Sequence, residues 1–162
     1  MKICFIVPYY SEQSNGIRIL YEAVKLFSNF SNQIFIGIYN SQLNQVDEKP
    51  NLSRIPKYFH HFLIEASNLN NDYIYILPET PACLPRNLNK NSKIVRYLLA
   101  NPFFFNKGSI NFKNNYLLSY SFFVSGGLPQ FYIPGFVSNQ IKKVDNSRRL
   151  IIYFGKFRLN NN

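Results

Sequence analysis

The sequence predicts an α/β fold with a mainly parallel sheet, and three observations lead to that prediction. Continuous apolar runs occupy residues 3–7, 34–38 and 73–77, a pattern typical of strands buried on both faces. A segment with helical spacing of its apolar residues separates the first two runs. Strands and helices that alternate along a chain indicate a layered α/β domain.

The first 39 residues form a strand–helix–strand unit. Residues 3–7 are the first strand, closed by Pro8, and a polar loop follows over residues 11–16. An amphipathic helix then runs to about Phe30, because apolar residues recur at its spacing: Ile17, Leu20, Tyr21, Val24 and Phe27. Residues 33–39 are the second strand, and we expect the crossover to be right-handed.

The next segment is polar before it becomes helical. Residues 40–54 are expected to be irregular. Pro56 can open a helix, since a residue in the first turn needs no amide donor. One face of that helix is apolar: Phe59, Phe62, Leu63 and Ala66. Residues 68–71 end it, and residues 73–77 form the third strand.

A second helix is predicted after residue 92. Ser92 is a suitable N-cap, apolar residues mark the buried side, and Pro102 ends the helix. The residues on the buried side are Ile94, Val95, Leu98 and Leu99. Beyond it we expect a loop over 103–115, a strand over 116–124 and a short strand over 130–133.

Residues 134–149 are polar and basic, which is the composition of a linker, and residues 150–156 begin a fresh strand. The predicted organisation is therefore a domain over 1–133, a linker over 134–149 and the start of a second domain over 150–162.

The 162 residues carry a net charge of +10, which favours anionic partners. The basic residues are scattered, without an Arg-rich run or an aromatic-basic RNA-binding signature. Nucleic acid is therefore the least favoured of the anionic partners. A diffuse, solvated positive surface is the simpler explanation of much of this charge. Cys4 and Cys83 are expected to be free thiols in a reducing compartment. With no signal-peptide pattern and no spanning segment, we expect a cytoplasmic protein, with contact to the inner face of the membrane left open.

Gly16 is the first candidate for ligand binding. It lies between a predicted strand and a helix, where free backbone amides suit a phosphate and a glycine allows close approach. Asn15-Gly16 is also an ordinary turn signal. Neither a GxGxxG nor a GxxxxGK[ST] motif occurs, so a dinucleotide or P-loop site is disfavoured.

Glu79 and Arg96 are the other charged candidates. Glu79 directly follows the third strand, at the edge where open α/β sheets bind ligands. It either orients sugar hydroxyls or accepts a proton, or, as we slightly prefer, it pairs with a nearby amide or with Arg96 to order the loop. On a helix, Lys93 and Arg96 would share a side and contact a phosphate or an acidic headgroup, although a solvated face is the more common arrangement.

Other chemistry has no support in the sequence. His60 and His61 are adjacent and would point about 100° apart on a helix, so they do not make an HExxH-type metal pair. There is no GxSxG nucleophile elbow. We expect no metal site and no catalytic residue within this chain.

Several motifs, taken in order, resemble the first half of GT-B glycosyltransferases of the GT4-like kind. Residues 2–8 resemble their first strand, and residues 15–23 their glycine-containing loop and first helix. Residues 76–79 are similar to a "YPE" strand end, and residues 94–102 to a "VVRWLLN-PG" segment. Residues 131–134 resemble the entry to the interdomain linker, and residues 153–156 a "Y-x-G-K" strand that opens the second domain.

Two departures accompany the resemblance. The glycine of the family's "GNPL" segment is replaced near Leu84-Pro85-Arg86, and the glycine after Pro102 is Phe103. The resemblance therefore does not define the loop geometry near residues 84–86.

The resemblance implies a Rossmann-like, three-layer domain that holds the acceptor, a saccharide or a lipid-linked molecule. A second domain of the family binds the nucleotide-sugar donor, so this chain alone is expected to bind no cofactor and to transfer no sugar. A separate donor-domain polypeptide would then complete it. The residues expected to line the acceptor side are Asn15, Gly16, Arg18, Glu79, Thr80 and Arg96. The alternative is a non-catalytic module whose basic surface binds an anionic saccharide, a lipid phosphate or a membrane face.

Overall fold

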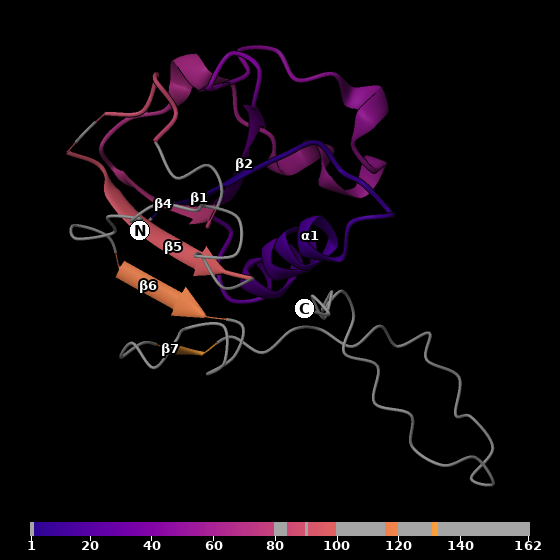
Figure 1. Cartoon of the computed structure of the whole chain (residues 1–162), viewed down its shortest axis with the longest axis horizontal. Helices are drawn as coiled ribbons and strands as arrows, with labels where there is room; N and C mark the ends of the chain where they lie inside the picture. The colour runs from indigo at the N-terminus through magenta and orange to yellow at the C-terminus, as the bar shows by residue number, and fades with distance from the viewer. Residues whose placement is uncertain (1, 80–83, 90, 100–115, 120–130, 133–162) are drawn as a thin grey trace, which may run out of the picture.

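The computed structural model describes residues 2–79, 84–89, 91–99, 116–119 and 131–132 (Figure 1). Within these residues one sheet forms the centre of the molecule. The predictions for the loop over 103–115, the linker over 134–149 and the segment 150–162 lie outside them, as does Cys83.

The sheet has seven strands in the order β3-β2-β1-β4-β5-β6-β7. All neighbouring pairs are parallel except β2 and β3, which are antiparallel. Ile3 of the central strand pairs with Ile34 on one side and Ile74 on the other. The predicted α/β fold with a mainly parallel sheet is therefore confirmed. The strands are β1 (Lys2–Val7), β2 (Ile34–Asn40), β3 (Gln45–Val46), β4 (Tyr73–Pro78), β5 (Lys93–Leu98), β6 (Tyr116–Ser119) and β7 (Phe131–Tyr132).

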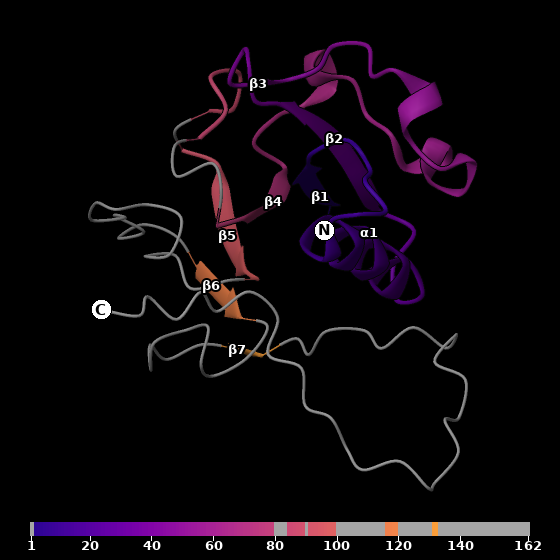
Figure 2. The same ribbon diagram turned by 45° about the vertical axis from the view of Figure 1, so that its right-hand side comes forward.

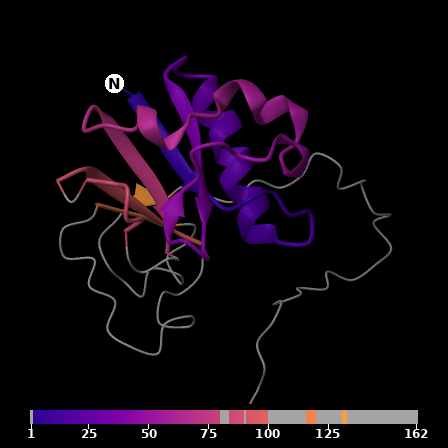
Figure 3. The same ribbon diagram turned by 90° about the horizontal axis from the view of Figure 1, so that it is seen from above.

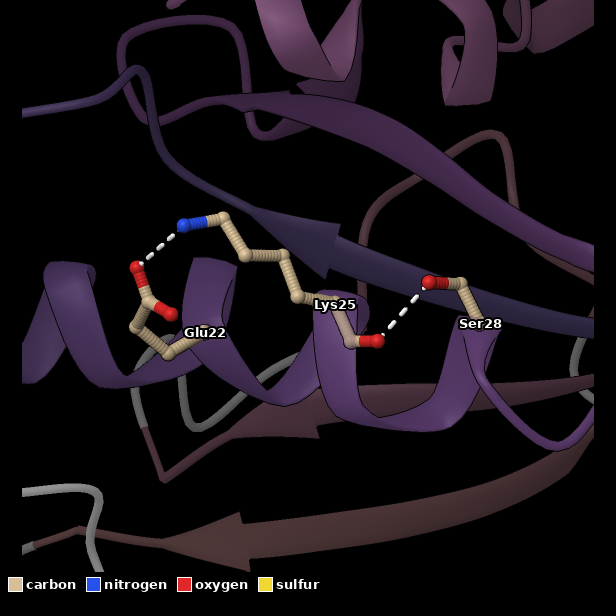
Figure 4. A network of polar contacts seen from close by, with 3 residues as sticks. All are labelled: Glu22, Lys25 and Ser28. Atoms are coloured by element: carbon tan, nitrogen blue, oxygen red, sulfur yellow. Dashed lines mark hydrogen bonds and ion pairs between the residues drawn. The ribbon is translucent and has the colours of Figure 1, made fainter.

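The helix α1 (Asn15–Ser28) connects β1 to β2, as predicted. The Ser14 side chain caps it by accepting a hydrogen bond from the amide of Ile17. At the rim of its buried face Lys25 bonds to Glu22 at 2.7 Å, and the Ser28 hydroxyl donates to the Lys25 carbonyl (Figure 4). Such an exposed i, i+3 pair adds only a few tenths of a kcal/mol, roughly 0.2–0.5, so the buried face of the helix holds it in place.

The polar segment 40–54 is more ordered than predicted. It contains β3 and the short 3₁₀ helix η1 (Leu52–Arg54). Asn44 turns the chain between β2 and β3 with a positive φ of 49°, and its side chain accepts a bond from the Tyr39 hydroxyl. Asparagine tolerates this conformation better than most residues.

The helix predicted after Pro56 is 3₁₀ rather than α. It comprises η2 (Lys57–Phe62) and, after a break, η3 (Ala66–Asn68). Phe59 and Phe62 are buried, and their i, i+3 spacing fits three residues per turn. The helix breaks because the backbone turns toward the sheet: Leu63 forms a parallel bridge with Ile36, and the amide of Ile64 donates to the Ile36 carbonyl.

The helix predicted after Ser92 is wrong, because these residues form strand β5. Ile76 of β4 pairs with Val95 of β5 in parallel register, and Val95 pairs in turn with Tyr116 of β6. The segment is rich in β-branched and aromatic side chains, which suit a strand buried on both faces. The amide of Ser92 bonds to the Asn89 carbonyl in a turn and caps no helix.

The predicted strands near the C-terminal part are confirmed where they are described. Residues 116–119 of the strand predicted over 116–124 form β6, and residues 131–132 of the one predicted over 130–133 form β7. The remaining residues of both predictions lie outside the described part of the chain.

Two apolar clusters pack on the two faces of the sheet. On one face α1 and η2 cover Phe5, Val7 and Ile36, and Figure 3 shows α1 on this side of the strands. On the other face Ile64 and Leu88 belong to loop segments that cover Cys4 and Leu77. Among the described residues, no helix is both long and apolar enough to span a bilayer.

The loop over the second face is held to the sheet edge. The side-chain amide of Asn87 bonds to both the amide and the carbonyl of Val46, each at 2.9 Å. The amide of Arg86 donates to the Asn44 carbonyl, so this loop lies beside β3 (Figure 2). These bonds satisfy backbone groups that an edge strand would otherwise expose.

Candidate functional site

The carboxyl ends of the parallel strands form the edge on which the sequence places its candidates. Pro8 and Tyr9 follow β1, Glu79 follows β4, and Leu99 follows β5. The strand order reverses between β1 and β4, because the chain first adds β2 on one side of β1 and later adds β4 on the other. Open α/β sheets bind ligands outside the carboxyl ends at such a reversal.

The start of α1 lies at this edge. A Cβ on Gly16 would be 3.7 Å from the Cδ1 of Leu99, at the end of β5, which is ordinary van der Waals contact. Packing therefore does not require a glycine at this position. Asn15 and Arg18 belong to the same first turns and are exposed.

Glu79 joins the ends of β4 and β5. Its side chain is only 5% exposed, and its Oε2 accepts a hydrogen bond from the amide of Leu99 at 3.0 Å. This is the amide pairing that we expected as the preferred alternative for Glu79. Leu99 therefore links the two candidates, since its amide bonds to Glu79 and its side chain lies where a Cβ of residue 16 would point.

Arg96 is buried in β5 rather than displayed on a helix. It is 1% exposed, and its Nη1 donates to the carbonyl of Pro78 at 3.0 Å. The predicted shared side with Lys93 is wrong, because residues three apart in a strand point to opposite faces. Lys93 is exposed. Thr80, the remaining candidate, lies outside the described residues.

A second polar cluster at the ends of β1 and β2 was not predicted. We call it the Tyr9 cluster, and it consists of Tyr9, Asn40, Asp47, Asn51 and Arg54. The Tyr9 hydroxyl donates to Asp47 Oδ2 at 2.7 Å and accepts from the amide of Asn51 at 3.0 Å. Asn40 Nδ2 donates to the other oxygen of Asp47 at 3.0 Å.

Arg54 covers the Tyr9 ring. Its guanidinium carbon lies 4.0 Å from the ring centroid, a cation–π geometry, and the residue is exposed. Partial burial raises the pKa of the Tyr9 hydroxyl, the amide of Asn51 opposes the shift, and the Asp47 carboxylate adds to it. The hydroxyl therefore remains a proton donor to Asp47 at neutral pH. Chemically, the cluster offers a carboxylate, amides and a guanidinium at one surface.

The cluster has a signal in the sequence that we did not use. Tyr9 follows a strand almost directly, as Glu79 does. Its partners Asp47 and Arg54 lie in the segment predicted to be irregular, 38 and 45 residues further along, so no local pattern links them.

The histidines and the thiol have structural positions. His60 Nε2 lies 2.9 Å from the carbonyl of Ile55 and 3.2 Å from that of Leu52. Cys4 is a free, fully buried thiol, and burial raises its pKa. In the described part of the chain, no three His, Cys, Asp or Glu side chains gather closely enough to hold a metal ion.

Comparison of the chain with protein-family models, with curated proteins and with solved structures found no match.

Proposed function

We propose that this chain supplies the acceptor-side half of a nucleotide-sugar-dependent glycosyltransferase, in a Rossmann-like domain of the GT-B kind. The observation that carries the proposal is the strand order. The chain adds β2 on one side of β1 and later adds β4 on the other side, so the strand order reverses between β1 and β4. At that point the start of α1, the Tyr9 cluster and Glu79 share one edge. The sequence resemblance includes the start of α1, within residues 15–23, and Glu79, within residues 76–79, but not the Tyr9 cluster.

The proposed roles follow from what each group offers. The amides at the start of α1, around Asn15 and Gly16, form the positive end of the helix dipole and suit an electronegative group of the acceptor. Asp47 and Asn40 are suited to sugar hydroxyls, and Arg54 to a phosphate or carboxylate. Arg18, one turn into α1, is exposed.

In this proposal Glu79 and Arg96 shape the edge instead of contacting the acceptor, because both are buried and bonded to neighbouring backbone groups. No residue of the chain is assigned to bond making. Its contribution is to position the acceptor against a donor bound elsewhere, and positioning alone supplies a large part of the acceleration of a two-substrate reaction.

Gly16→Ala tests the proposal, since the structure accommodates the added methyl group. We expect the variant to fold normally and to bind an acceptor saccharide at least tenfold more weakly, because the methyl group occupies the space of the ligand. Binding to maltotriose and chitotriose would be measured by calorimetry. Asn32→Ala, an exposed substitution away from this edge, is the matched control. Equal affinities for all three proteins would contradict the proposal.

A transfer assay tests whether the chain acts alone. The purified chain, incubated with nucleotide sugars and the same acceptors, is expected to form no product. Product formed by the chain alone would show that it carries a complete active site.

The second candidate is a non-catalytic module that binds anions, and the net charge of +10 favours it. It predicts salt-sensitive binding to vesicles that contain anionic phospholipid. In this case Arg54→Ala would weaken vesicle binding, and Gly16→Ala would leave it unchanged.

A further inference from the structure

The sequence contains a single Asn-Gly pair, Asn15-Gly16, and the fold places it at the first two residues of α1. An asparagine reacts with its own backbone when the nitrogen of the following residue attacks the carbon of the side-chain amide. Glycine favours this reaction because it has no Cβ to hinder the approach. The fold then decides the rate, through the freedom of the asparagine side chain and the freedom of the attacking nitrogen.

At this pair both reacting groups are free of hydrogen bonds to the described residues. Asn15 is exposed, and its side chain bonds to no residue that the structure describes. The cap of α1 holds the groups further along instead, since the Ser14 side chain accepts from the amide of Ile17 and its carbonyl accepts from that of Arg18. The amide of Gly16 has no acceptor in the described part of the chain. Helix ends fray at little cost, so Asn15 can leave the helical conformation while the domain stays folded.

Among the described residues, two other asparagines precede a serine, and in both the structure holds the reacting groups. Asn40 uses both ends of its side chain: Nδ2 donates to Asp47 at 3.0 Å, and Oδ1 accepts from two backbone amides. Asn91 precedes Ser92, whose amide donates to the Asn89 carbonyl at 3.0 Å. These bonds must break before either asparagine reacts, so the fold protects them and leaves Asn15 unprotected.

We propose that Asn15 is a site of self-modification, at which the folded chain deamidates. The Gly16 nitrogen loses its proton and bonds to the side-chain carbon of Asn15, and the bond from that carbon to the amide nitrogen breaks, so that ammonia leaves. Water then adds to one of the two carbonyl groups of the resulting succinimide ring and opens it. The product is aspartate or isoaspartate, depending on which carbonyl reacts, and no oxidant or reductant takes part.

The two products affect α1 differently. Aspartate places a negative charge at the positive end of the helix dipole, which is a favourable position. Isoaspartate routes the main chain through the former side-chain carbon, which adds a methylene group to the backbone and interrupts the first turn. Either product lowers the formal net charge of +10 by one. The modification does not depend on the proposed function, although it alters the edge at which that function is placed.

The test compares the rate of deamidation in the folded full chain with the rate in urea, both in mildly alkaline buffer. Trypsin releases residues 3–18, in which Asn15 is the only asparagine, so mass spectrometry of this peptide follows the reaction directly. We expect folding to slow the reaction of Asn15 no more than about tenfold, as for a helix end that opens readily. Asn40 and Asn91, followed in the same digest, should be slowed far more.

Two variants locate the reaction. Gly16→Ala, which the packing against Leu99 accommodates, should slow the reaction of Asn15 at least tenfold, because the added methyl group hinders the attack. Gln13→Ala, an exposed substitution within the same peptide, is the matched control and should leave the rate unchanged. A protein isoaspartate methyltransferase should label the aged wild-type chain and the aged Gln13→Ala chain, and label Gly16→Ala far less.

Three results would overturn the proposal. One is an Asn15 that stays intact in the folded chain over a period in which it converts in urea. Another is protection of Asn15 by folding as large as that of Asn40 and Asn91. The third is a rate that Gly16→Ala leaves unchanged, since the change in mass would then come from another residue.

Discussion

The two halves of the carboxyl edge contain the same kinds of side chains in opposite settings. At the end of β4 and β5, Glu79 and Arg96 are buried and bonded to backbone groups. At the end of β1 and β2, Asp47 is partly buried and Arg54 is exposed over the Tyr9 ring. A charged residue after a strand is therefore not a functional signal by itself. Its burial decides whether it stabilises the edge or presents chemistry to solvent.

The largest expected difference is between the two arginines. Arg96→Ala should lower the free energy of unfolding by about 3 kcal/mol, because it removes a large buried side chain and the bond to the Pro78 carbonyl. Arg54→Ala should change it by less than about 0.5 kcal/mol, as is usual for surface substitutions. Urea unfolding of both variants measures this contrast. Equal losses would mean that the two ends do not differ in the way described.

Alkaline pH should destabilise the fold, both at the end of β1 and at Tyr75 of β4, whose pKa burial also raises. Burial raises the pKa of Tyr21, whose hydroxyl donates to the Pro8 carbonyl, and the pKa of Tyr9 is raised as well. Above pH about 10 the unfolded chain loses these protons while the folded chain keeps them, so stability falls as pH rises. The stability that these two hydroxyls contribute is fully present below that pH.

The slope approaches about 1.4 kcal/mol per pH unit for each such group. Urea unfolding between neutral pH and pH about 11 gives this slope, and Tyr21→Phe should reduce it. A slope that Tyr21→Phe leaves unchanged would assign the alkaline loss to other groups, such as the buried thiol of Cys4.

Two substitutions of Glu79 distinguish the effect of its charge from the effect of its hydrogen bond at the buried end. Glu79→Ala should cost about 1–2 kcal/mol, because the amide of Leu99 loses its acceptor. Glu79→Gln keeps an acceptor oxygen and should cost clearly less. Thermal unfolding of the two variants measures the difference. Equal costs would show that the negative charge, and not the bond to Leu99, is what the fold needs.

A stability effect no larger than that of Glu79→Ala is expected for the Tyr9 hydroxyl at the exposed end. Tyr9→Phe removes the hydroxyl that joins Asp47 to the amide of Asn51 and should cost about 1 kcal/mol. If the Tyr9 cluster binds the acceptor, saccharide binding should fall more than stability does. Calorimetric binding and thermal unfolding of this variant, compared with Asn32→Ala, check both parts.

The strands β1, β2 and β4 could be predicted because each is a continuous apolar run whose burial on two faces leaves no helical alternative. Strand β5 could not. Ile94, Val95, Leu98 and Leu99 also match one face of a helix, and Ser92 and Pro102 offered plausible ends. Pairing with β4, more than a dozen residues away, decides the outcome, and a local pattern does not contain it.

The candidate site could be predicted only in part, because the sequence shows where strands end but not which distant segments meet there. Glu79 directly follows β4, and Gly16 begins the helix that follows β1, so the parallel topology brings them to one edge. The setting of Arg96 was predicted wrongly because the segment that forms β5 was predicted to be a helix. The Tyr9 cluster depends on contacts across about forty residues with a segment that has no apolar pattern, and only the folded chain brings them together.

The most direct test of the account is to map saccharide binding along the carboxyl edge. In an NMR titration of the ¹⁵N-labelled chain with maltotriose or chitotriose, the account predicts shifts for amides at the exposed end, around Tyr9, Asn15, Gly16 and Arg54. The amide of Leu99, bonded to Glu79, should shift far less. Shifts absent from the exposed end, or centred on the buried end at Glu79 and Arg96, would contradict it.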